Sequence, residues 1–317
     1  MVTVIGPAIV DVLVKPFHNK VFEQGTYAAE DIRLSYGGNA LNEAVILGRL
    51  GEETELVTKI GADEAGENVR RFAMESGVNC DRFLVDANMV TGINVVLVDE
   101  SGERYFLTNP NSNLRKLALE DILPFIPQMG KTVCFPCMFT SPLLGIKEMT
   151  ELFRAIKENG DRTLFLDMTT PKNGERIEEM RELFSYVDYF MPNEKELLML
   201  SNSSTIGEAA EEVLSCGAGC VIVKRGKNPT KIFLPGKEEE IPVYDRAKPI
   251  DSTGAGDCFG GGLIYALENK MPLKEAARFA NACASCTVEA VGATNGVLSL
   301  REPNQRYAYM KEKEGGM

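Results

Sequence analysis

A glycine-bearing turn that leads into an apolar helical pattern carries the most chemical information in this sequence. The segment Asp251–Leu263 reads DSTGAGDCFGGGL. Gly254, Ala255 and Gly256 fall where the helix should begin, and the unpaired N–H groups and positive dipole of a helix start form an anion site. Asp257 follows in the first turn, where a carboxylate can take the proton of an attacking hydroxyl. The pattern fits a phosphate site with a general base, but it equally fits an ordinary glycine-rich helix start.

Two other nucleotide-binding patterns fit the sequence less well. Gly254-Ala255-Gly256 resembles a GxG turn, but the dinucleotide-binding fingerprint needs a preceding buried strand, and the approach Ala247–Asp251 is a poor strand. The Walker pattern GxxxxGK[ST] does not occur in the sequence, which argues against a P-loop kinase.

The bulk composition argues against several classes of protein. The 317 residues carry a net charge of −12 without a dense run of Lys and Arg, so we expect no nucleic-acid binding. No stretch of 18 apolar residues and no signal-peptide pattern is present, so we expect neither a membrane span nor secretion. The eight cysteines lie mostly in apolar segments, which is typical of free thiols in a reducing cytoplasm. We therefore expect a cytoplasmic protein.

Two CxxC pairs raise the question of a zinc site. Cys134/Cys137 lie in a strand-like run and Cys283/Cys286 in a helix-like run. Neither pair has the knuckle-type turn that presents two thiolates to one metal, so we expect these cysteines to pack in the core.

Strand-like apolar runs alternate with helical patterns along most of the chain. Val2–Ile5 and Thr54–Ile60 read as strands, with a helix at Ala40–Leu50 between them. This alternation predicts a mostly parallel sheet covered by helices on both faces. Val12–Tyr36 and Gly92–Thr108 break the rhythm, and the second reads as a hairpin that turns at 99–102. The two segments form either an edge of the main sheet or a small separate sheet over a site.

Several motifs together resemble one family. Asp251–Leu263 resembles the C-terminal signature, D-(T/S)-T-G-A-G-D, of the PfkB or ribokinase-like carbohydrate kinases. The N-terminal signature of that family has a counterpart in Gly37–Ala44, GGNALNEA. Further matches, in family order, are Gly6 to Asp11, Thr58–Gly66 and Pro192–Glu196. The resemblance implies a single kinase domain over 1–317. Its fold would be a three-layer α/β/α sandwich, with a small β-sheet lid formed by about 12–36 and 92–108.

The resemblance also assigns roles to individual residues. It makes Asp257 the catalytic base and Gly254, Ala255 and Gly256 the anion hole. It implies sugar binding by Asp11, Gly37, Gly38, Asn39 and Asn42. It implies ATP binding by Asn193, Lys224, Gly226 and Asn281. It implies Mg²⁺ organised through water by Asn193 and Glu196, and a monovalent cation, K⁺, at Asp251, Thr253, Thr287, Ala290 and Gly292. Many relatives carry Thr or Ser where Lys224 stands.

The resemblance leads to one function and several alternatives. We expect an ATP-dependent kinase that transfers the γ-phosphoryl group to a primary hydroxyl of a ribose- or fructose-like sugar. Asn39 stands where many phosphosugar kinases have a lysine, which favours an unphosphorylated substrate. A nucleoside kinase is the nearest alternative, with Tyr27, Tyr36, Tyr105 or Phe106 as a platform for the base. A non-catalytic sugar-binding relative and an NAD-dependent dehydrogenase are further alternatives. In this family lids often pair between subunits, so we also expect a homodimer through the lid.

Overall fold

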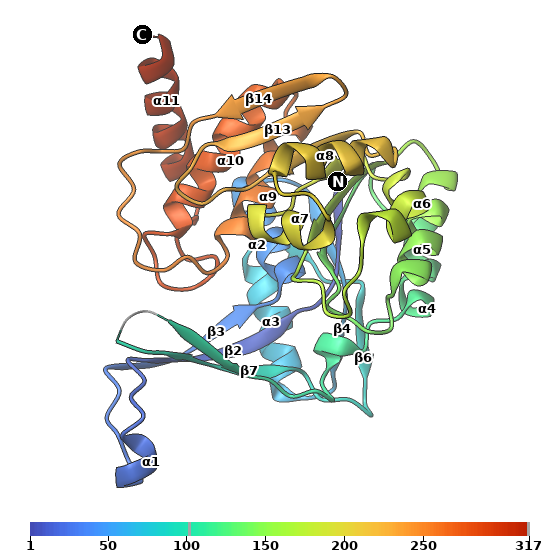
Figure 1. Cartoon of the computed structure of the whole chain (residues 1–317). Coiled ribbons are helices and arrows are strands. Elements are labelled where there is room, and N and C mark those ends of the chain that lie inside the picture. Colours follow the sequence, from blue (N-terminus) through green and yellow to red (C-terminus); the bar gives the residue numbers. More distant parts are fainter. Residues whose placement is uncertain (101–102, 316–317) are drawn as a thin grey trace.

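A ten-stranded sheet forms the centre of the protein (Figure 1). The structure is a computed structural model, and it describes residues 1–100 and 103–315. Most neighbouring strands are parallel, and the last two form an antiparallel hairpin. In sheet order the strands are β14 (Lys237–Ile241), β13 (Thr230–Leu234), β12 (Cys220–Val223), β11 (Tyr189–Phe190), β10 (Thr163–Met168), β9 (Thr132–Met138), β1 (Val2–Ile5), β4 (Thr54–Gly61) and β5 (Val78–Asn79), with β6 (Phe83–Asp86) also paired to β4.

Helices cover both faces of this sheet, and each face has its own apolar core. One face carries α2 (Asn39–Leu50), α3 (Glu64–Glu75), α9 (Ala255–Glu268) and α10 (Leu273–Thr287), with α11 (Arg301–Gly315) packed on α10. The other face carries α4 (Leu119–Ile122), α5 (Ile146–Glu158), α6 (Arg181–Phe184), α7 (Glu194–Leu200) and α8 (Ile206–Ser215), with the 3₁₀ turns η2 (Leu123–Gln128) and η3 (Ile177–Met180). The predicted three-layer sandwich is confirmed.

Burial on both faces explains why the central strands read as continuous apolar runs. In β12, Cys220 and Ile222 face one core, whereas Val221 and Val223 face the other. A parallel sheet between two helical layers has no solvated face, so successive side chains are all apolar.

A second, four-stranded sheet stands apart from the central one, and we call it the lid sheet. Its order is β3 (Asp31–Gly37), β2 (Ile9–Lys15), β7 (Ile93–Val98) and β8 (Arg104–Leu107), and the short helix α1 (Val21–Gln24) lies between β2 and β3 in the chain. The β7–β8 pair is the predicted hairpin, although Ser101 and Gly102 of its turn lie outside the described residues. Because no strand of this sheet pairs with the central sheet in the described structure, the edge-hairpin alternative is wrong.

The last helix is held against α10 by charged and polar side chains. Helix α11 continues to Gly315, and Arg278 of α10 forms ion pairs with both Glu275 and Glu314. The Tyr307 hydroxyl donates a hydrogen bond to Oε2 of Glu275, with 2.7 Å between the two oxygen atoms. The contacts of Glu314 and Tyr307 hold α11 against α10. Among the described helices, none is long and apolar enough to cross a membrane.

Candidate active site

The start of α9 forms the floor of the site. Gly254 is the N-cap, with a φ of +71° that glycine adopts without strain. A Cβ on Gly254 would lie 2.4 Å from the carbonyl oxygen of Ala293, so both the conformation and the packing require glycine here. Ala255 and Gly256 then open the helix, where the Ala255 N–H donates to the Ser252 carbonyl at 3.3 Å and the Gly256 N–H has no partner within the helix. The turn therefore has the geometry of the predicted anion site.

Asp257, in the first turn of α9, is the centre of a hydrogen-bonded group. Its Oδ1 accepts from Asn39 Nδ2 at 2.9 Å and its Oδ2 accepts from Asn42 Nδ2 at 2.7 Å. Burial raises the pKa of Asp257, while the hydrogen bonds from Asn42 and Asn39 and the charge of Lys224 act in the opposite direction. A carboxylate of raised basicity, held in one orientation by two amides, suits a general base.

Helix α2 delivers those two amides because Asn39 and Asn42 are three residues apart and share one face of the helix. Gly38 precedes the helix with a φ of +98°, and a Cβ there would lie 2.5 Å from the Pro7 carbonyl oxygen. A Cβ on Gly37 would lie 2.1 Å from Oδ2 of Asp11. The two glycines therefore let the lid strand β3 turn into α2 directly beside the Asp11 carboxylate.

Asp11 lies within β2 of the lid sheet, and the structure adds a partner for it. Asn94 of β7 donates to Oδ1 of Asp11 at 3.2 Å. Burial raises the pKa of Asp11, and the Asn94 hydrogen bond partly offsets this effect. Sequence reasoning missed Asn94. The available signal was its position in the strand. Asn94 is a polar residue that shares the buried face of β7 with Val96 and Val98.

A buried cluster of charged groups lies beneath Asp257, and two of its members were not predicted. Lys224, just after β12, forms an ion pair with Asp167 of β10. Burial alone would lower the pKa of Lys224, but the charges of Asp167, Glu196 and Asp257 outweigh it and raise the pKa. Burial raises the pKa of Asp167 to about 7 against the opposing charge of Lys224. A signal for Asp167 existed, since it is a charged residue at the end of an apolar strand.

Glu43 of α2 is the other unpredicted member. It is fully buried, its Oε2 accepts from the Cys134 thiol at 2.8 Å, and its Oε1 has no partner among the described residues. Burial, followed by the charge of Asp167, raises the pKa of Glu43 well above its ordinary value. This setting favours the neutral form of the Glu43 carboxyl group.

Asn193 and Glu196 form a capping box at the start of α7. Asn193 Oδ1 accepts from the Glu196 N–H at 2.9 Å, and the Asn193 N–H donates to Glu196 Oε2 at 3.0 Å. Magnesium prefers oxygen donors and keeps several waters, and the Glu196 carboxylate close to Asp167 fits that preference. These residues would hold the ion through water.

The predicted cation segment is tied together by Asp251. Its Oδ1 accepts from the N–H and hydroxyl of Thr253, and its Oδ2 accepts from the Gly292 N–H at 2.9 Å. The Thr287 carbonyl accepts from the Ala290 N–H at 3.1 Å. The structure thus brings together all five residues of this prediction, although Thr287 lies 36 positions after Asp251 in the chain.

The remaining predicted nucleotide residues lie near β12 and β14. Gly226 has a φ of +60° in the exposed turn after β12. Asn281 is buried, accepts from the Thr230 hydroxyl at 2.9 Å and donates to the Pro242 carbonyl at 3.0 Å. Both ends of the Asn281 amide are therefore engaged within the chain, so it fixes the segment that follows β14.

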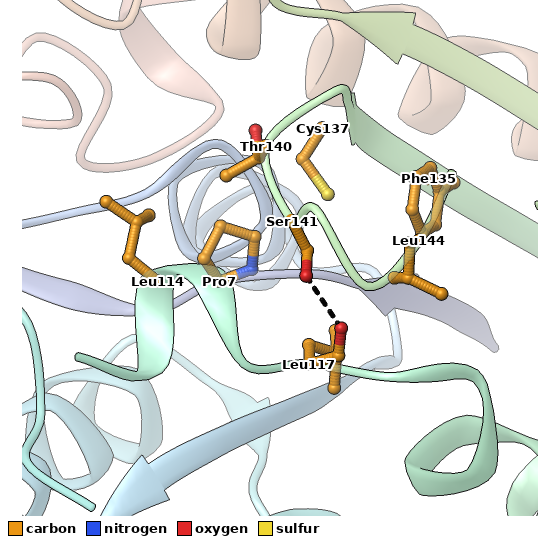
Figure 2. A pocket seen from close by; sticks show the side chains of 8 residues that line it. All are labelled: Pro7, Leu114, Leu117, Phe135, Cys137, Thr140, Ser141 and Leu144. Carbon is orange, nitrogen blue, oxygen red and sulfur yellow. Dashed lines mark hydrogen bonds between the residues drawn. The ribbon is translucent and has the colours of Figure 1, made fainter. Parts of the chain in front are cut away.

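Two cavities lie away from Asp257. Figure 2 shows the smaller, about 10 Å³, which Pro7, Cys137 and Thr140 line, with Ser141 donating to the Leu117 carbonyl beside it. Its volume is about that of one water probe, which is too small for a sugar. The larger, about 370 Å³, is lined by residues that include Lys59, Asp86 and Asp121, and Lys59 is already paired with Asp121 at 3.0 Å. Neither cavity is lined by Asp257 or by the two asparagines that hold it.

A helix start beside a held carboxylate, in a three-layer sandwich with a small separate sheet, is the arrangement expected of a phosphotransferase. The pfkB family carbohydrate kinase profile matches residues 1–300. A ribokinase from Haemophilus influenzae is 26% identical over 308 residues, which are 95% of this chain and 96% of that protein. Aminoimidazole riboside kinase from Salmonella typhimurium is 27% identical over 285 residues, and the match covers 86% of this chain and 87% of that protein.

A solved structure agrees with these relatives. An E. coli protein assigned as a ribokinase II, solved with ATP and Mg²⁺, matches with a TM-score of 0.83 and 25% identity over 97% of this chain and 99% of that one. The chain belongs to the pfkB family of carbohydrate kinases. It is a phosphotransferase that acts on a sugar or nucleoside.

Proposed function

We propose that this protein transfers the γ-phosphoryl group of ATP to a primary hydroxyl of a small unphosphorylated sugar. The observation that carries the proposal is the Asp257 carboxylate. It is buried at the anion-binding start of α9 and is held by Asn39 and Asn42. Similarity to a ribokinase over nearly the whole chain supports a sugar as acceptor.

The proposed chemistry follows from these positions. Asp257 accepts the proton of the sugar hydroxyl as its oxygen attacks phosphorus, and the bond between phosphorus and the ADP oxygen breaks. The N–H groups at Gly254, Ala255 and Gly256 stabilise the charge on the transferring group, which is where most of the catalysis of phosphoryl transfer resides. Asn193 and Glu196 would hold Mg²⁺ through water, and the ion would supply positive charge to the phosphates.

Sugar recognition would use the residues that meet between the lid sheet and α2. Asp11, held by Asn94, accepts hydrogen bonds from sugar hydroxyls, and Gly37 and Gly38 let the backbone approach the sugar. The buried Oδ1 of Asn42 has no partner among the described residues and is a ready acceptor. ATP would lie along Asn193, Lys224 and Gly226, with Asn281 fixing the adjoining segment.

The monovalent cation belongs to the same proposal. Asp251 joins the turn before α9 to the segment after α10 through Thr253 and Gly292. A K⁺ ion beside this carboxylate and the surrounding carbonyl oxygens would hold the anion hole in shape.

A nucleoside kinase is the second candidate. The ring of Tyr36 stacks on that of Phe72 with 4.6 Å between centroids, and the Tyr27 and His18 ring centroids are 5.4 Å apart. Both tyrosine rings therefore already have partners. Tyr105 and Phe106 of β8 are exposed and would be available to a base. Similarity to aminoimidazole riboside kinase supports this alternative.

Measurement of ADP release over a panel of sugars and nucleosides, with Mg²⁺ and K⁺ present, tests the proposal. We expect the best kcat/KM with an unphosphorylated sugar. Asp257→Asn should fold and bind ATP but turn over about 10²–10⁴-fold more slowly, because a general base contributes that factor. An Asp257→Asn enzyme that kept more than about a third of the activity would remove Asp257 from the role of base.

A further inference from the structure

The Lys224 ammonium occupies an electrostatically costly position. Its side chain is only 14% exposed and forms an ion pair with Asp167, whose side chain is 5% exposed. A Cβ built on Gly256 would lie 3.3 Å from Nζ of Lys224, so the ammonium faces the first turn of α9. The N-terminal end of a helix carries positive partial charge and repels a cation. An anion bound next to both Lys224 and this helix start would therefore be stabilised by the ammonium and by the helix together.

The cation stays charged despite its burial. The carboxylates of Asp167, Glu196 and Asp257 together raise the pKa of Lys224, although burial acts against them. Within the part of the chain that the structure describes, Asp167 is the one hydrogen-bond partner of this ammonium. A lysine ammonium has three N–H donors, so two remain available to a ligand.

A contribution to stability does not explain the buried ion pair between Lys224 and Asp167. A buried ion pair costs desolvation on both sides, and apolar residues of similar volume often stabilise a protein equally well or better. The pair also lies at the carboxyl ends of β10 and β12, beside the catalytic Asp257, and not in the middle of the sheet.

We propose that Lys224 is a catalytic residue that binds the transferring phosphoryl group from the side of the sheet, and that Asp167 is the residue that positions it. This inference rests on the proposed kinase function. The proton of the sugar hydroxyl passes to Asp257, the new O–P bond forms, and the bond from phosphorus to the ADP oxygen breaks with its electron pair left on ADP. Lys224 keeps its proton throughout and opposes the charge on the equatorial oxygens.

Steady-state kinetics of four variants test the inference. Lys224→Met should lower kcat about 10²–10³-fold, the loss expected when one donor to a developing anion is removed, and leave the sugar KM unchanged. Asp167→Asn should lower kcat about 10–100-fold, because it misplaces the ammonium without removing it. The double variant Lys224→Met/Asp167→Asn should be no slower than Lys224→Met alone, since Asp167 acts only through Lys224.

The double variant also guards against misfolding, because it leaves no unpaired charge in the core. Lys157→Met is the matched control. Lys157 pairs with Asp188 at 2.5 Å at the opposite, amino-terminal end of β10 and β11. This control should change the melting temperature but not kcat.

The outcomes distinguish a failure of the proposed function from a failure of the inference about Lys224. If the wild-type enzyme releases no ADP with any acceptor, the proposed function and this inference both fail. If the wild type is active and Lys224→Met keeps more than about a third of its kcat, the inference alone is overturned. Independent losses that multiply in the double variant would overturn the positioning role of Asp167.

Discussion

Replacement of Gly254 by alanine should damage both stability and activity through two separable effects. At a φ of +71° an alanine Cβ approaches the following carbonyl, which costs about 1–2 kcal/mol. The new Cβ would also lie 2.4 Å from the oxygen and 2.6 Å from Cα of Ala293. Because both of these atoms belong to the backbone, the chain must shift to make room, which costs about 1–3 kcal/mol. The free energy of unfolding should therefore fall by about 2–5 kcal/mol.

Gly236 provides a matched control for this prediction. It has the same φ of +71°, in the turn between β13 and β14, but a Cβ there would meet nothing within 4 Å. Gly236→Ala should lose only the conformational part, about 1–2 kcal/mol, and retain full activity. Urea unfolding with unchanged slopes gives both values, and ADP release gives the activities. Equal losses of stability in the two variants would refute the argument that Ala293 clashes with residue 254.

Four further predictions concern the rest of the site and the lid. Asp11→Ala should raise the sugar KM strongly, by the equivalent of about 2–5 kcal/mol, while the ATP KM stays nearly constant in initial-rate assays. Potassium should activate the enzyme more than sodium at fixed ionic strength, and equal rates with a bulky organic cation would contradict a cation at Asp251. The lid sheet exposes apolar side chains at Ile32, Leu34, Phe106 and Leu107, so sedimentation should show a homodimer at micromolar concentration, and a monomer would contradict it. In the folded protein Glu43 keeps its proton above the ordinary pKa of 4.5, whereas the unfolded chain releases it there. The free energy of unfolding should therefore fall as pH rises, by at most about 1.4 kcal/mol per pH unit. Glu43→Met should flatten that slope in urea titrations above about pH 5.

The features that were predictable from the sequence are those fixed by neighbouring residues. The alternation of apolar runs and helical patterns gave the layered α/β fold, because burial on both faces of a strand demands continuous apolar residues. The small residues Gly254 and Gly256 before an apolar helix pattern located the start of α9. The hairpin β13–β14 was missed, because its second strand, Lys237–Ile241, is mostly charged and lies at the edge of the sheet.

The tertiary structure decided which distant groups meet Asp257. Asn39 and Asn42 reach its carboxylate across more than 200 residues, because α2 and α9 pack side by side on one face of the sheet. Lys224 and Asp167 meet because β10 and β12 end at the same edge of a parallel sheet, with β11 between them.

Sequence alone determined that Asp257 belongs to a helix start able to bind an anion, since capping and helix periodicity are local properties. Only the packed structure decided that this carboxylate is buried, held by two amides and neighboured by a lysine. Strand order and helix packing set those contacts, and they depend on burying apolar surface from the whole chain at once.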